Sequence, residues 1–98
     1  MNYRNQKITK SAQGRECTFQ IPGVCNHDSS TTVWVHSDQQ RHGKGVGIKA
    51  HDIFGAYGCS DCHAWYGEGK ANRDEKRDAF QLAYEKSLLI LLRSGVIG

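Results

Sequence analysis

The chain has few apolar residues and no long hydrophobic run. The longest apolar run near the C-terminus is Leu88–Leu92, whereas a membrane-spanning helix needs about 18 or more apolar residues. The N-terminus also lacks the apolar segment that characterises a secretory signal peptide. With a mean hydropathy of −0.63, the composition excludes membrane and fibrous proteins. We therefore expect a cytoplasmic protein that does not bind a membrane.

Internal repeats and low-complexity segments are also lacking, and a length of 98 residues leaves little room for a second domain. We predict a single domain over residues 1–98, with a basic N-terminal segment at 1–16 and a C-terminal helix at 72–94. Asn72 is the expected N-cap of that helix and Gly95 its stop. Its apolar face at helical spacing is expected to be Phe80, Ala83, Ser87 or Leu88, and Leu91.

Shorter elements are expected before that helix. Residues 31–36 are rich in β-branched and aromatic side chains and predict a strand that ends at His36. Residues 50–57 are ambiguous between a short helix and an irregular segment, and a helix is expected to begin near Cys59. Together with the C-terminal helix, these elements predict a small α+β domain.

Four cysteines are present in a chain for which we expect a reducing compartment, so disulfides are the less favoured use. Cys59 and Cys62 have the C-x2-C spacing of a metal-binding knuckle. Cys17 and Cys25 are further apart, and a hairpin that turns at Pro22-Gly23 would bring them together. Because four thiolates in tetrahedral array suit Zn2+, we predict a structural zinc site made by all four cysteines. Free thiols or disulfides are the alternative.

Five histidines are a surplus for a chain of this length. His63 directly follows Cys62 and His36 ends the predicted strand, so we expect the two imidazoles to face each other across a small cleft. One could bind a divalent ion while the other activates water. In a smaller variant of the zinc site, His27 or His63 would replace one cysteine.

Residues 41–49 predict a glycine-rich, basic loop rather than a regular element. Glycines let backbone amides approach a ligand closely, and the side chains of Arg41, Lys44 and Lys49 can neutralise phosphates. The spacing does not fit a Walker A motif, which disfavours nucleotide hydrolysis. The net charge of +3 is compatible with a nucleic-acid partner. We predict that this loop binds nucleic acid, and the alternative is a flexible surface loop.

The order of these motifs resembles that of zinc-bearing HNH nucleases of the His-Me finger (ββα-metal) group. Over about residues 1–95, the chain more closely resembles the YbcO-type family of phage and prophage HNH-like nucleases. The blocks that carry this resemblance are Cys17–Cys25, Val35-His36-Ser37, Arg41–Asp52 and Gly58–His63. The resemblance implies a small treble-clef domain with structural zinc and a metal-dependent endonuclease activity. It also implies a role in phage recombination or repair inside a bacterial host cell.

The resemblance further implies roles for individual residues. His36 resembles the general base that activates water, with Asp52 or His51 orienting it. His63 resembles the ligand of a catalytic divalent ion such as Mg2+. Where many HNH sites carry a metal ligand directly before the base, this chain has Val35. A second ligand is therefore open, and the candidates are His51, Asp52 and Asp38.

The implied partner is nucleic acid, with DNA favoured over RNA. One alternative is a non-catalytic zinc-finger module that binds DNA or a protein partner, and another is a zinc-stapled adaptor with no nucleic-acid role. Val35 favours the binding module, whereas the pair of His36 and His63 favours the enzyme. The C-terminal helix is apolar on nearly every side over Leu88–Leu92, which predicts a homodimer formed through this helix.

Overall fold

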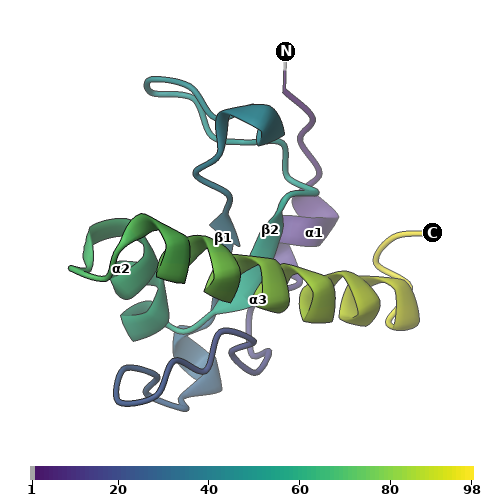
Figure 1. Ribbon diagram of the computed structural model, residues 1–98. Helices are drawn as coiled ribbons and strands as arrows, with labels where there is room; N and C mark the ends of the chain where they lie inside the picture. The colour runs from purple at the N-terminus through teal and green to yellow at the C-terminus, as the bar shows by residue number, and fades with distance from the viewer. Residues whose placement is uncertain (1) are drawn as a thin grey trace.

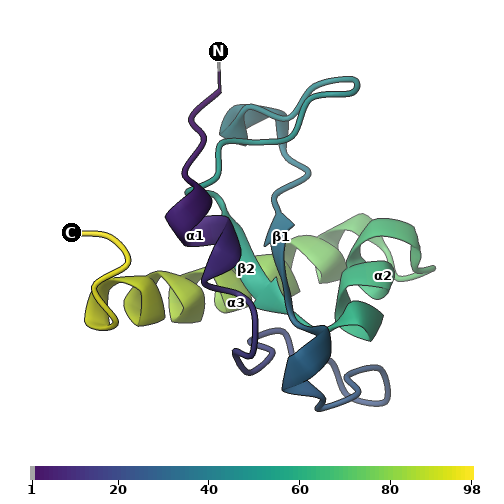
Figure 2. The ribbon, with the colours of Figure 1, turned by 180° about the vertical axis from the view of Figure 1, so that it is seen from behind.

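The computed structural model describes residues 2–98. Its elements, in chain order, are α1 (Gln6–Lys10), the 3-10 turn η1 (Ser29–Thr31), β1 (Val33–His36), the 3-10 turn η2 (Gln40–His42), β2 (Gly55–Gly58), α2 (Ser60–Glu68) and α3 (Arg73–Arg93). The long helix α3 crosses one side of the two strands (Figure 1), and α1 lies on the other side, as the view from behind shows (Figure 2). The small α+β architecture with a C-terminal helix is confirmed.

The two strands form one antiparallel sheet, in which Trp34 pairs with Tyr57 and Val35 with Ala56. The strand β1 lies within the predicted segment. The strand β2 falls where the sequence was ambiguous, because Gly-Ala-Tyr-Gly has none of the β-branched residues that mark a strand. All four of its residues are buried. Burial between two packed layers, rather than intrinsic propensity, therefore makes this segment a strand.

Each face of the sheet has its own hydrophobic core, because successive side chains of a strand point to opposite faces. Val35 and Ala56 lie in a cluster with Phe19, Tyr66 and Phe80. The residues of the second cluster are Ile8, Ala12, Trp34, Tyr57 and Leu91. The helix α3 contributes to both clusters, so it holds the two layers together.

The helix α3 begins and ends where the sequence predicts. The side chain of Asn72 accepts a hydrogen bond from the backbone N–H of Glu75 at 2.8 Å, and Gly95 follows the helix with a φ of +78°. At the position left open between Ser87 and Leu88, Ser87 is the buried residue. Its hydroxyl oxygen accepts a hydrogen bond from the backbone N–H of Tyr57 at 3.0 Å, so a polar group in the core is satisfied.

The expected hairpin between Cys17 and Cys25 is wrong. Both Val24 and Cys25 donate their backbone N–H to the carbonyl of Ile21, at 3.0 and 2.9 Å. The segment therefore turns at the predicted place, but no strand ladder flanks the turn. Within residues 2–98, no helix combines the length and the apolar character needed to cross a membrane.

The close approach of Trp34 to the backbone of β2 generates a stability prediction. A methyl group at Gly55 would overlap the indole ring of Trp34, whereas one at Gly67 in α2 would meet no atom within 4 Å. We expect Gly55→Ala to lower the free energy of unfolding by about 1–3 kcal/mol. Gly67→Ala should leave it unchanged or raise it by up to about 1 kcal/mol, because alanine is the better helix former. Urea denaturation of the two variants measures the difference, and equal stabilities would contradict the assigned packing.

Candidate active site and metal centre

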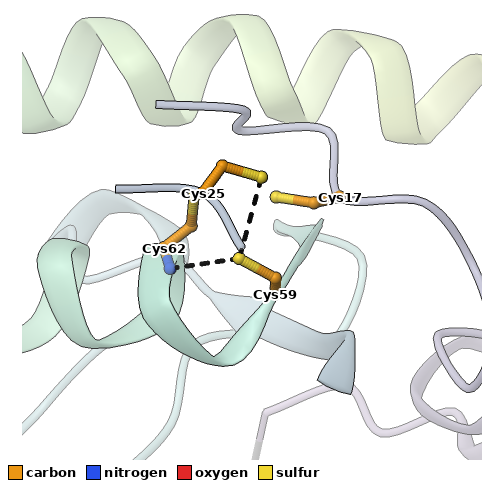
Figure 3. A group of neighbouring side chains, drawn as sticks. All are labelled: Cys17, Cys25, Cys59 and Cys62. Atoms are coloured by element: carbon orange, nitrogen blue, oxygen red, sulfur yellow. Dashed lines mark hydrogen bonds between the residues drawn. The ribbon is translucent and has the colours of Figure 1, made fainter. Parts of the chain in front are cut away.

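The four cysteines converge at one point, where the turn at residues 17–25 meets the start of α2 (Figure 3). Their sulfur atoms all lie within 4.8 Å of one another, and the Sγ atoms of Cys25 and Cys59 are 3.9 Å apart. Four sulfurs bound to one zinc at about 2.3 Å would form a tetrahedron with edges of about 3.8 Å. The donor set therefore fits a four-coordinate metal such as zinc. None of the four is in a disulfide.

Backbone amides already point at this cluster. Cys59 is the N-cap of α2, and its sulfur accepts the backbone N–H of Cys62 at 3.3 Å. The sulfur of Cys17 accepts the N–H of Gln20 at 3.4 Å. Burial acts to raise the pKa of the Cys59 thiol, but donation from Asn26, Cys62 and Cys25 outweighs it and lowers the pKa to about 7. A thiolate is the form that binds a metal, so the local structure prepares this ligand.

A cleft of about 630 Å³ opens beside the cysteine cluster. The residues that line it are Thr9, Trp34, Val35, His36, Ser37, Asp38, Lys44, Lys49, His63, Tyr66 and Gly67. His36 reaches it from the end of β1, and His63 from the first turn of α2. The two imidazoles thus share one cleft, because the strand ends opposite the helix that Cys59 caps.

His36 is paired with a carboxylate on the side away from the cleft. Its Nε2 lies 2.8 Å from Oδ1 of Asp52. Asp52 does not line the cleft, and its side chain is 4% exposed, against 17% for His36. A neutral imidazole that donates from Nε2 to this carboxylate keeps the lone pair of Nδ1 free to take a proton. The pair therefore has the arrangement of a base held by a buried acid.

The N-terminal segment fixes Asp52 in turn. Arg4 Nη1 lies 3.1 Å from Oδ1 of Asp52, and the backbone N–H of Asn5 donates to Oδ2 at 2.6 Å. Burial acts to raise the pKa of Asp52, but hydrogen bonds from His36 and Asn5 and the charges of His36 and Arg4 hold it below its usual value. Arg4 and Asn5 were missed at the sequence level, because nothing in a polar N-terminus indicates a partner 47 or 48 residues away.

The other candidate ligands and orienting residues differ in position. His51 is directed elsewhere, since its Nδ1 accepts the backbone N–H of Tyr3 at 2.8 Å. Both carboxylate oxygens of Asp52 are already engaged. Val35 is 1% exposed and belongs to the core. Asp38 remains, since it lines the same cleft as His63.

A divalent ion in the cleft would have few ligands from the protein. Within the described residues, the cysteines are the one place where three or more His, Cys, Asp or Glu donors converge. His63 and Asp38 could supply one or two ligands, and water and phosphate oxygens would complete the shell. This donor set suits Mg2+, which usually keeps several waters when it binds with substrate phosphates.

The basic loop divides between two hollows. Lys44 and Lys49 line the cleft with the two histidines. Arg41 lines a neighbouring hollow instead, and its Nε donates to Oε1 of Gln39 at 2.7 Å. The three predicted phosphate contacts are therefore not one group.

These features define a small α+β protein with a four-cysteine centre and a histidine–aspartate pair beside a basic cleft. The chain belongs to the family described as "Putative nuclease YbcO", whose profile matches residues 6–90. Two curated relatives are each 41% identical over 56 residues. They are "Putative nuclease YbcO" of Escherichia coli (strain K12) and "Putative nuclease ybcO" of Enterobacteria phage 82. Each match spans 57% of this chain and 57% of the relative.

A solved structure has a similar fold over nearly its whole length. Its title is "Structure of a putative bacteriophage protein from Escherichia coli str. K-12 substr. MG1655", and the TM-score is 0.73. The likeness covers 90% of this chain and 99% of the other, at 28% sequence identity. The family described by name as a nuclease and this shared fold agree with a nuclease role for the chain.

The buried carboxylate generates a pH prediction. Because the pKa of Asp52 is lowered in the folded protein, its ionised form stabilises the fold above the unfolded value of about 3.9. This contribution is lost as the pH falls through the lower, folded value. We expect Asp52→Asn to cost about 1.5–3 kcal/mol near neutral pH, the usual worth of hydrogen bonds to a charged group. Urea denaturation of parent and variant should show this difference shrinking from pH 5 downward. A constant difference would contradict the ionised pair.

Proposed function

We propose that the protein is a metal-dependent endonuclease of the HNH type, which hydrolyses phosphodiester bonds in DNA. The proposal places it in phage recombination or repair, in the cytoplasm of a bacterial host cell. One observation carries it: His36, paired with buried Asp52, opens onto the same cleft as His63. The family's descriptive name agrees with this chemistry.

In this scheme each side chain of the cleft has its own task. His36 accepts a proton at Nδ1 from the attacking water, and Asp52 holds the imidazole in the orientation that leaves Nδ1 free. His63 holds the catalytic ion with Asp38, while Lys44 and Lys49 bind the phosphates that flank the scissile bond. A divalent ion such as Mg2+, when bound, supplies charge stabilisation to the scissile phosphate and the leaving oxygen.

We propose that the cysteine cluster is a structural zinc site of treble-clef type, separate from the chemistry. Its four sulfurs leave no open position for substrate, as is typical of structural zinc. It supports the cleft because Cys59 starts the helix that carries His63. The exposed residues Leu82, Leu89 and Leu92 of α3 are the proposed contact of a homodimer, which stays a prediction.

The metal is tested on the purified protein. We expect one zinc ion per chain by elemental analysis, and Cys59→Ser or Cys62→Ser should lower both the metal content and the melting temperature. The loss should be large, since structural zinc contributes about 10–16 kcal/mol of binding free energy in small zinc fingers. A strong chelator should reproduce the effect in the parent. Full folding of metal-free protein would show that the cluster is not a metal site.

The catalytic assignment is tested by cleavage of DNA with Mg2+ or Mn2+. His36→Ala should lose about 10²–10⁴-fold in rate, the usual worth of a positioned base, while zinc content and DNA affinity stay at the parent level. His63→Ala should in addition raise the concentration of divalent ion needed for half-maximal rate, because a ligand is removed.

Cleavage by the parent should also fall as the solution is acidified, since a protonated imidazole cannot accept a proton. A His36→Ala variant that cleaves like the parent would overturn the assignment. If the parent binds DNA but cleaves no DNA or RNA substrate, the non-catalytic binding module is the better description.

A further inference from the structure

A second basic hollow, of about 670 Å³, lies next to the cleft. Its lining residues are Asp38, Gln39, Gln40, Arg41, Arg73 and Arg77. Arg41 comes from η2, whereas Arg73 and Arg77 come from the first turns of α3. Three guanidinium groups from two distant segments thus face one space. Asp38 lines both the hollow and the cleft, so the two are adjacent.

The positive charge of this hollow is not neutralised within the chain. Among residues 2–98, the ion pairs are those of Asp52 with Arg4 and His36, and none involves these three arginines. The one carboxylate in the hollow belongs to Asp38, and its Oδ1 accepts a hydrogen bond from the hydroxyl of Tyr66 at 2.8 Å. Arg73 and Arg77 also lie four residues apart on one helix face, where like charges destabilise a helix. An anionic ligand would offset this arrangement.

Gln39 gives an independent indication of a missing partner. It lines the hollow and is 8% exposed. Its Oε1 holds Arg41 at 2.7 Å, yet its Nε2 has no hydrogen-bond partner among the described residues. Buried donors are rarely left unpaired. An oxygen acceptor in the hollow would satisfy this amide and face the guanidinium groups.

We propose that Arg41, Arg73 and Arg77 form a second phosphate-binding site, which holds the DNA backbone beside the cleft. This inference rests on the proposed function, because the strand cleaved between His36 and His63 would continue across Asp38 into the hollow. Planar guanidinium groups suit phosphate oxygens, since they donate two parallel hydrogen bonds. The site binds backbone and not bases, so it adds affinity without sequence preference.

The test measures binding of a fluorescently labelled DNA duplex to the intact, metal-loaded chain over a range of salt concentrations. The double variant Arg73→Gln/Arg77→Gln should bind more weakly, and the slope of log affinity against log salt should fall by about two units. The matched control is Lys86→Gln/Arg93→Gln, which removes the same charge from exposed positions of the same helix outside the hollow. The control should keep the slope of the parent.

Several outcomes would overturn the site. A parental slope in the arginine variant, an equal loss in the control, or no DNA binding by the parent would each do so. If the double variant does not fold, as judged by its zinc content and circular dichroism, Arg41→Gln alone should reduce the slope by about one unit. An unchanged slope in that variant would also overturn the site.

Cleavage separates this inference from the proposed function. In a parent that cleaves DNA, the arginine variant should raise KM and leave kcat near the parental value, because uniform binding is lost and the base is untouched. A parent that binds DNA without cleaving it would refute the nuclease and leave the hollow to be judged by the salt slopes. A parent that cleaves while the variant keeps the parental slope would refute the hollow alone.

Discussion

The convergence of four sulfurs at the start of α2 is the constraint on which the rest of the structure depends. A two-stranded sheet is marginal by itself, and here its strands have four residues each. The segment from Cys17 to Cys25 has no helix or strand of its own. Its cysteines bring it against Cys59 and Cys62, and Phe19 then packs in the core with Tyr66 and Phe80. The cluster therefore connects a loop, a strand end and a helix start.

The same junction decides where the chemistry can lie. Because Cys59 directly follows β2 and caps α2, His63 is placed in the first turn of the helix and faces the end of β1. His36 then meets Asp52 at 2.8 Å, and Arg4 from the N-terminal segment holds that carboxylate from the other side. A base supported by a buried acid needs all three segments together, so the site is a product of packing and not of one motif.

The distribution of charge supports an extended ligand. The cleft has Lys44 and Lys49 on its walls, and the adjacent hollow collects arginines from η2 and α3. A net charge of only +3 would not by itself indicate a polyanion. The indication comes from the uneven placement of that charge, because cations gathered without counter-charges raise the local potential far more than the same cations spread over a surface.

The sequence by itself determined the features that depend on local chemistry. These were the strand that ends at His36, the capped helix α3, the glycine-rich basic loop and the four metal-type cysteines. It also placed Asp52 next to the presumed base by resemblance. Tertiary structure alone decided that Gly-Ala-Tyr-Gly is a strand and that Arg4 holds Asp52. It also decided that Arg41 lies with Arg73 and Arg77 rather than with the lysines. These outcomes depend on contacts between segments far apart in the chain, and local propensity and motif spacing carry no information about such contacts.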